Sequence, residues 1–269
     1  PPRSTLFPYT TLFRSRPENP WFTRNIANRT WAWVMGRGII HEPDDIRDNN
    51  PPSNPELLAY LQKELISSGF DLKHLKRLIF TSATYQFSSI PKGKEPEASA
   101  NFASYLLRRV EAEVLIDALN DITGSTDLYT SAVPEPFTYI PQEMSAVSLA
   151  DGSVTSTFLT LFGRSSRSTG MQSERVSELA STQWLYMLNS GQIQNKLQSG
   201  PKLNALVSSG GKTNEIAERL YLTILSRLPT EADLSTVEEY AKTGVTKGRD
   251  MWIDLAWALV NSPEVLLRH

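Results

Sequence analysis

Two arginines in a glycine-bounded loop are the side chains of this sequence best suited to hold an anion. Residues 163–170 read GRSSRSTG, so Arg164 and Arg167 stand among four hydroxyl side chains, and Arg175 follows shortly afterwards. A guanidinium group binds sulfate or phosphate through paired hydrogen bonds, and loop N–H groups add donors. Arginines on loops more often pair with nearby carboxylates, and Glu174 offers one here, so we favour a surface loop. The alternative is an oxyanion site made of Arg164, Arg167 and Arg175.

An imidazole and carboxylates gather at residues 41–45, which read HEPDD. His41, Asp44 and Asp45 are ligand types that zinc, calcium or iron accepts, and the two aspartates could act as general acid and base. However, Pro43 makes the segment irregular, and neighbouring residues of an extended segment point to opposite sides. No second histidine stands at a helical ligand spacing. We interpret the group as a solvated or structural polar cluster and predict no metal site.

The remaining motifs are weaker. Gly211-Lys212-Thr213 resembles the end of a phosphate-binding loop, but Leu206 stands where that motif needs its first glycine. The sequence has no cysteine, which excludes thiolate zinc sites, a cysteine nucleophile and covalent attachment of haem c within these residues. We therefore expect no cofactor in this fragment and lean against an enzyme.

The elements that position these residues are predicted to be helices. Apolar residues recur at helical spacing over 20–33, 54–68, 72–79, 102–122, 178–198, 214–226, 230–243 and 248–260. Asp71 and the pair Thr230 and Asp233 are expected to cap helices, as are Ser53 and Glu56. Thr157–Phe162 is predicted to form a short strand. The expected fold is mainly α, an orthogonal or bundle-like domain with long irregular loops and at most a little β structure.

The organisation of the chain is predicted from its loops. Residues 3–15 match one translated reading frame of a widely used sequencing adapter, so 1–15 are expected to be non-native, with the true upstream sequence missing. The rest is expected to comprise an N-terminal helical subdomain (16–90), a helix with an irregular connecting region (91–155) and a C-terminal helical subdomain (156–269). These three parts could also form a single domain.

The composition narrows the possible partners. The chain has 27 basic and 29 acidic residues, a formal charge of −2, so it lacks the positive field that holds a nucleic acid backbone. No apolar run approaches the roughly 20 residues that a membrane-spanning helix needs. We expect neither a nucleic acid partner nor a membrane span in this fragment.

Most of the chain resembles a known family. Asn28–Ile46, Pro51–Ser89, Leu107–Leu119, Phe158–Leu197, Leu220–Leu234 and Asp254–His269 closely resemble the planctomycete-type domain of unknown function numbered 1553. Many relatives look to have a histidine where Asn54 stands and a Cys-x-Cys where Met171 and Ser173 stand. Those departures weaken a metal or thiol role at these positions here.

The resemblance implies architecture and compartment rather than chemistry. Such domains look like the C-terminal part of long secreted bacterial proteins, whose upstream portion often carries a c-type cytochrome module. It therefore implies a periplasmic or cell-surface location, haem c in the upstream region, and the upstream domains of the same polypeptide as partners. We expect a non-catalytic scaffold or interaction domain with a possible protein or carbohydrate partner. The alternative is an enzyme or accessory module that binds anionic carbohydrate or sulfate.

Overall fold

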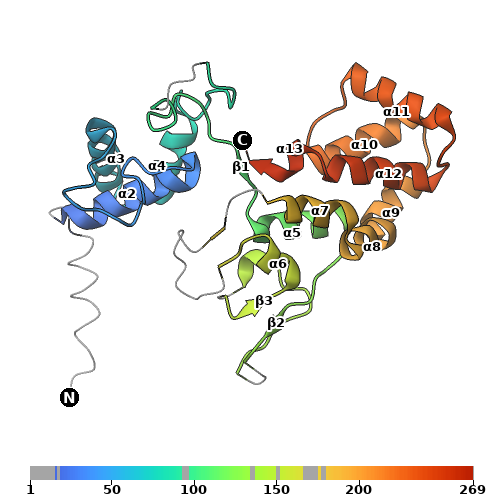
Figure 1. Cartoon of the computed structure of the whole chain (residues 1–269), viewed down its shortest axis with the longest axis horizontal. Helices are drawn as coiled ribbons and strands as arrows, with labels where there is room; N and C mark the ends of the chain where they lie inside the picture. The colour runs from blue at the N-terminus through green and yellow to red at the C-terminus, as the bar shows by residue number, and fades with distance from the viewer. Residues whose placement is uncertain are drawn as a thin grey trace. The chain divides into compact units, whose positions relative to one another are not determined.

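The computed structural model of the chain describes residues 16, 19–92, 97–133, 137–149, 152–165, 175–176 and 180–268. The described part is mainly helical and each of its strands is two residues long, which confirms the predicted fold class. The chain divides into two compact units, one ending at Leu107 and one spanning Arg108–Arg268 (Figure 1). The division expected from the sequence near residues 90 and 155 stays a prediction.

The helices of the first unit begin at short polar caps. They are α2 (Pro20–Met35), α3 (Pro55–Ser67) and α4 (Leu72–Phe80). The side chain of Asn19 accepts a hydrogen bond from the N–H of Trp21 at 3.1 Å, and Asp71 accepts one from Lys73 at 2.7 Å, as predicted for Asp71. The expected cap at Ser53 is wrong: Asn54 caps α3, because Pro55 starts its first turn.

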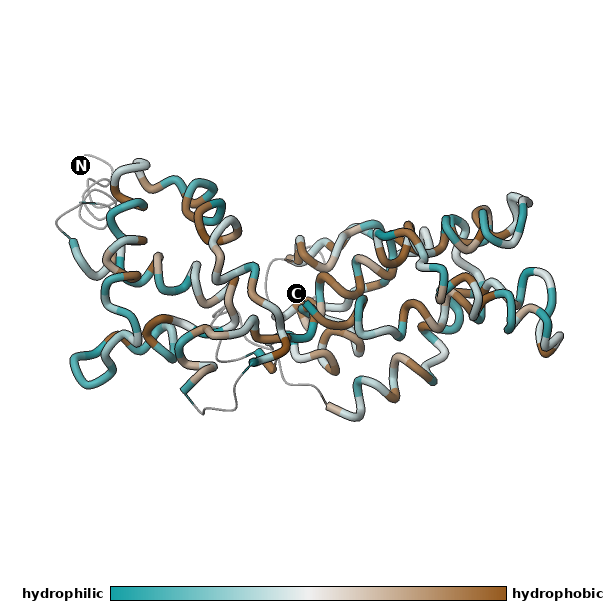
Figure 2. Tube along the Cα trace, turned by 90° about the horizontal axis from the view of Figure 1, so that it is seen from above, coloured by the Kyte–Doolittle hydropathy of each residue, from teal (hydrophilic) through white to brown (hydrophobic). Residues whose placement is uncertain are grey.

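The core of the first unit forms where α2 packs against α3 and α4. Its buried side chains are mostly aliphatic, and Trp31 meets Phe102 edge to face with ring centroids 5.2 Å apart. Along the helices, hydrophobic residues alternate with hydrophilic ones in short stretches (Figure 2). This alternation gives each helix one apolar side to bury.

The second unit is a longer succession of helices with short strand pairs. The helices are α5 (Ala112–Thr123), η1 (Ala146–Ser148), α6 (Thr157–Leu161), α7 (Ser181–Asn189), α8 (Gly191–Ser199), α9 (Pro201–Ser208), α10 (Thr213–Leu225), α11 (Glu231–Thr243), α12 (Arg249–Val260) and α13 (Pro263–Leu266). The strands are β1 (Arg108–Arg109), β2 (Thr130–Ser131), β3 (Val154–Thr155) and β4 (Leu267–Arg268). β1 pairs with β4, and β2 with β3, both antiparallel.

Helix α5 lies at the centre of the second unit's packing. It contacts α6, α8, α9 and η1, while α12 contacts α8, α9, α10 and α13. Leu115, Ile116 and Leu119 of α5 are almost fully buried. The pairing of β1 with β4 brings the end of the described chain beside the start of this unit (Figure 1). The residues that lead into α5 are therefore held by the end of the described chain, where the N–H of Val110 also donates to the oxygen of Leu266.

Several local predictions for the second unit are wrong. Thr157–Phe162 was expected to be a strand, but residues 157–161 form α6, because Ser156 caps the turn through Leu159 N–H and Phe158 and Leu159 are buried on one side. The helix expected at 178–198 is broken at Ser190, which ends α7 and caps α8. Helix α5 begins ten residues later than residue 102, because β1 precedes it.

Among the described residues, no helix is both long enough and apolar enough to cross a membrane.

Candidate functional site

Two glutamates at the start of α5 accept hydrogen bonds and ion pairs from arginines that lie far away in the sequence. Glu111 directly precedes the helix and Glu113 lies in its first turn. A helix N-terminus favours negative charge, because its first N–H groups have no partner inside the helix. The Glu113 side chain is only 9% exposed, whereas that of Glu111 is 34% exposed. A buried carboxylate requires cationic or hydrogen-bonding partners.

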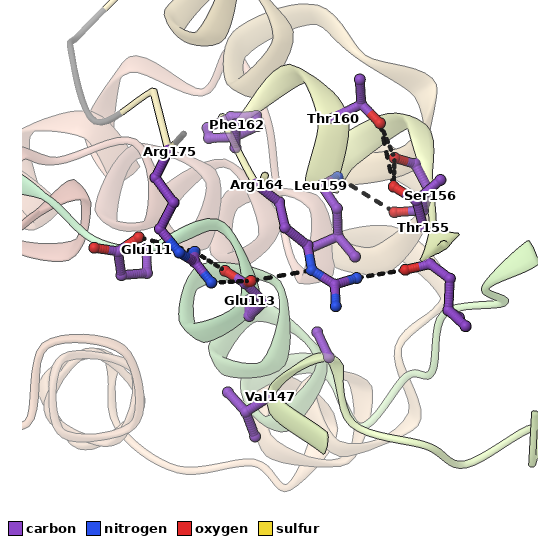
Figure 3. Close-up of polar contacts among 12 residues, drawn as sticks. Glu111, Glu113, Val147, Thr155, Ser156, Leu159, Thr160, Phe162, Arg164 and Arg175 are labelled. Atoms are coloured by element: carbon purple, nitrogen blue, oxygen red, sulfur yellow. Dashed lines mark hydrogen bonds and ion pairs between the residues drawn. The ribbon is translucent and has the colours of Figure 1, made fainter. Parts of the chain in front are cut away.

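Arg175 is the first of these partners. Its two terminal nitrogens donate to the two oxygens of Glu113 at 2.9 and 2.8 Å, and Nη1 also lies 3.2 Å from Glu111 (Figure 3). Burial by itself raises the pKa of Glu113, but the hydrogen bonds from Arg175 and the charge of Arg164 outweigh it and lower that pKa. The pKa of Arg175 is raised, chiefly by its hydrogen bond to Glu113. Both groups are therefore charged at neutral pH.

Arg164 reaches the same carboxylate from the other side. Its Nε lies 3.1 Å from Glu113 Oε1, its Nη1 donates to the backbone oxygen of Val154 in β3, and its side chain is 7% exposed (Figure 3). Two of the three arginines considered for an oxyanion site, Arg164 and Arg175, thus converge on one glutamate. The guanidinium of Arg175 connects its own backbone position to α5, and the guanidinium of Arg164 connects α5 to β3.

A further arginine, Arg109 in β1, completes the group. Its Nη2 donates to the backbone oxygens of Phe162 at 2.6 Å and Val176 at 3.0 Å, and its guanidinium lies 5.4 Å from the centre of the Phe162 ring. Burial lowers its pKa, and the charges of Glu111 and Glu113 oppose that change. An arginine stays protonated under such shifts. We call Arg109, Glu111, Glu113, Arg164 and Arg175 the arginine–glutamate cluster.

The backbone supports the same connection. Val176 donates to the oxygen of Gly163 at 3.0 Å, and Gly163 has a φ of +78°. A Cβ at this glycine would collide with the backbone oxygen of Val176. Only glycine combines that backbone conformation with so close an approach. Gly163, the first residue of the arginine loop, is therefore held close to Val176, and Arg109 links Phe162 and Val176 to β1.

Sequence reasoning found only part of this cluster. Arg164 and Arg175 were singled out, and Arg167 lies outside the described residues. Arg109, Glu111 and Glu113 were missed, although two glutamates at alternate positions before an apolar helix were a usable signal. The oxyanion site stays a hypothesis, and within the cluster Arg164 and Arg175 pair with the two glutamates.

The predicted polar cluster lies in the first unit, where its side chains pair locally. Asp44 accepts hydrogen bonds from Nε and Nη2 of Arg29 at 2.5 and 2.9 Å. The hydrogen bonding to Asp44 raises the pKa of Arg29. Asp45 pairs with Arg47 at 2.5 Å, and His41 lies 3.8 Å from Glu42. Among the described residues, no three His, Asp or Glu side chains are grouped so as to hold a metal ion.

The loop that carries these residues is built on Asn28. This side chain is fully buried on α2, donates to the backbone oxygens of Ile40 at 3.0 Å and Pro43 at 3.3 Å, and accepts from the N–H of Ile40 at 2.9 Å. Asn50 closes the other side by donating to the oxygens of His41 and Asp45. The side-chain amides of Asn28 and Asn50 thus fix the shape of this loop.

Comparison with known proteins gives one match. The model of the family described as PSD1, a protein of unknown function (DUF1553), matches residues 13–241, a range that includes the arginine–glutamate cluster and the loop on Asn28. No curated protein and no solved structure matches the chain.

Proposed function

This chain belongs to the DUF1553 family, described as proteins of unknown function, and on that basis we propose that it is a non-catalytic helical scaffold or interaction domain of a larger exported bacterial protein. Its partners are the upstream domains of the same polypeptide. Its location is the periplasm or the cell surface, and the upstream region carries a haem c module. These last points rest on the resemblance described above.

The observation that carries the scaffold proposal is that charged side chains of the second unit pair with one another across distant segments. In the arginine–glutamate cluster, Arg175 forms a bidentate pair with Glu113 and the nearly buried Arg164 lies against the same carboxylate. A buried ion pair between segments distant in the sequence disfavours arrangements that would leave one of the two charges without its partner. Such a group supports a fixed surface, which an interaction domain needs.

The intact gene and its product test this proposal. The gene should encode an export signal and a Cys-x-x-Cys-His motif upstream of the region that encodes this chain. Its product, expressed in a bacterium that matures c-type cytochromes, should be found in the periplasmic or surface fraction with covalently bound haem. A product retained in the cytoplasm, or one without covalent haem, would contradict the exported and cytochrome-associated part of the proposal.

A second candidate function is binding of an anionic carbohydrate or sulfate. It is favoured by the excess of arginines over glutamates in the cluster and by the 27% exposure of the Arg175 side chain. Titration calorimetry of the chain with glucuronate and with sulfate tests it, with chloride at equal ionic strength as the control. Saturable heat that is lost in Arg175→Lys would favour this function, because lysine keeps the charge but not the bidentate geometry.

A further inference from the structure

A surface pocket in the second unit lies where the chain leaves α5 and passes α8. Its volume is about 310 Å³. The segment after α5 contributes Ser125, Thr126 and Asp127, and α8 contributes Asn195 and Lys196 among others. Helices α5 and α8 lie in contact (Figure 1). This volume is at the lower end of the range found for small-molecule sites.

The pocket contains a connected network of buried polar groups. Lys196 Nζ lies 2.8 Å from Asp127 Oδ2 and donates to Ser125 Oγ at 3.0 Å. Gln192 donates to Asp127 Oδ1 at 2.7 Å and accepts from the hydroxyl of Tyr186 at 2.6 Å. The side chains of Lys196 and Asp127 are 7% and 11% exposed. Their positions are therefore fixed before any ligand arrives.

The charge of this network is balanced. One ammonium group faces one carboxylate, so the pocket offers no net charge to a free anion or cation. The carboxylate of Asp127 would repel a sulfate, and the ammonium group of Lys196 would repel a metal ion. Charge balance therefore favours a neutral ligand.

The rim of the pocket supplies groups that both donate and accept. The side chains of Thr126, Asn195 and Ser199 line the pocket and belong to exposed residues. Hydroxyl and amide groups each offer a donor and an acceptor, and Asp127 Oδ1, which accepts from Gln192, can accept a second hydrogen bond. Such a set is complementary to a molecule that carries several hydroxyl groups on neighbouring carbons.

We propose that this pocket binds a small neutral polyhydroxylated molecule, of the size of one monosaccharide unit. A ligand hydroxyl donates to Asp127 Oδ1 and another accepts from the amide of Asn195, while Lys196 and Gln192 hold the carboxylate in place. The site is separate from the arginine–glutamate cluster, and it does not depend on the scaffold function.

Titration calorimetry of the whole chain tests the proposal with D-glucose, D-mannose, D-xylose and myo-inositol as probes. Each is added to about 10 mM, tenfold above a dissociation constant of about 1 mM. At least one should give saturable heat. Glucuronate and sulfate serve as charged controls and should bind this pocket more weakly than the neutral probes.

Two variants locate the binding. Ser199→Trp fills the pocket from an exposed helix position and should abolish the heat. Asn195→Ala removes one amide and should weaken binding about threefold to tenfold. Gln198→Ala, an exposed position on α8 outside the pocket lining, is the matched control and should leave binding unchanged. Circular dichroism shows whether each variant is folded.

The results that overturn the proposal are equally specific. One is the absence of saturable heat from every neutral probe. Another is heat that survives both Ser199→Trp and Asn195→Ala, which places the sugar elsewhere. Tighter binding of sulfate or glucuronate that is sensitive to Ser199→Trp would show a site for anions instead.

Discussion

Glu113 is the residue through which distant parts of the second unit reach α5. Its carboxylate accepts two hydrogen bonds from Arg175, 62 residues later in the chain, and lies 3.1 Å from Arg164. Removing one partner of a buried ion pair leaves the other charge without compensation, which costs more than the pair contributes over apolar residues. The stability of this unit should therefore be sensitive to a change that alters charge but not shape.

Glu113→Gln should lower the free energy of unfolding by about 3–5 kcal/mol, because two guanidinium groups lose their shared carboxylate. The measurement is urea denaturation followed by circular dichroism. Glu111→Gln is the matched control: that side chain is 34% exposed and makes a single 3.2 Å contact, so its loss should cost about 1 kcal/mol or less. Equal costs for the two variants would show that Glu113 has no special structural role.

Asn28→Ala should destabilise the first unit by about 1–3 kcal/mol, because the N–H and oxygen of Ile40 lose a buried partner. Asn25→Ala, a partly exposed position on the same helix, should change the free energy of unfolding much less. Chemical denaturation of both variants measures the difference. If Asn28→Ala is no worse than Asn25→Ala, the loop at residues 38–46 is not held by this amide.

At the scale of elements, local sequence was most informative where the cause of a structure is itself local. The caps at Asp71 and Thr230 were predicted because a side chain and an N–H group two or three residues later suffice to form them. Helices α10, α11 and α12 begin and end within one residue of their predicted bounds. Their apolar spacing was regular enough to fix both position and type.

Prediction from the sequence failed where tertiary packing decides the local structure or the pairing of side chains. Thr157 and Phe158 favour strands by composition, but burial of Phe158 and Leu159 and the cap at Ser156 make this turn helical. The arginine–glutamate cluster joins residues more than sixty positions apart, so no local pattern could pair Arg175 with Glu113. The arginines and the glutamates were each visible in the sequence, whereas their pairing was not.

Gly163→Ala should destabilise the second unit more than the same change at Gly210. Both glycines have positive φ, +78° and +69°, but a Cβ at Gly163 would meet the backbone oxygen of Val176, while the space at Gly210 is open. The control should cost about 1–2 kcal/mol for its backbone conformation alone, and Gly163→Ala clearly more. Thermal unfolding of the two variants compares them. Equal losses would mean that the segment at Val176 can move away freely.

The start of α11 should show a specific acid dependence. Hydrogen bonds from the backbone N–H of Thr230 and from Arg227 lower the pKa of Asp233 from its ordinary 3.8 to about 2. Because the folded-state pKa is the lower one, the ionised carboxylate stabilises the fold above about pH 4, and this contribution is lost as the pH falls towards 2.

Asp233→Asn should therefore cost about 1 kcal/mol at pH 7, the usual size of a helix cap, and much less at pH 2. Urea midpoints measured across this range test the prediction. Glu239→Gln, an exposed position on the same helix, is the control and should show no such change. A gap between wild type and Asp233→Asn that stays constant from pH 7 to pH 2 would be inconsistent with the lowered pKa.

At the scale of the whole molecule, the two units have separate hydrophobic cores, one around Trp31 and one around α5. Separate cores allow parts of a protein to open independently. In hydrogen exchange measured by mass spectrometry, Glu113→Gln should lose protection in α5 and α8, while α3 keeps its own. Asn28→Ala should do the reverse. Loss of protection throughout the chain in both variants would show that the units unfold together.

A scaffold domain binds the other parts of its own polypeptide. The upstream region, produced from the intact gene, should bind the chain with saturable heat in titration calorimetry, and Glu113→Gln should weaken that binding because the surface it supports loses its fixed shape. Absence of any binding by a chain whose circular dichroism shows it to be folded would contradict the account.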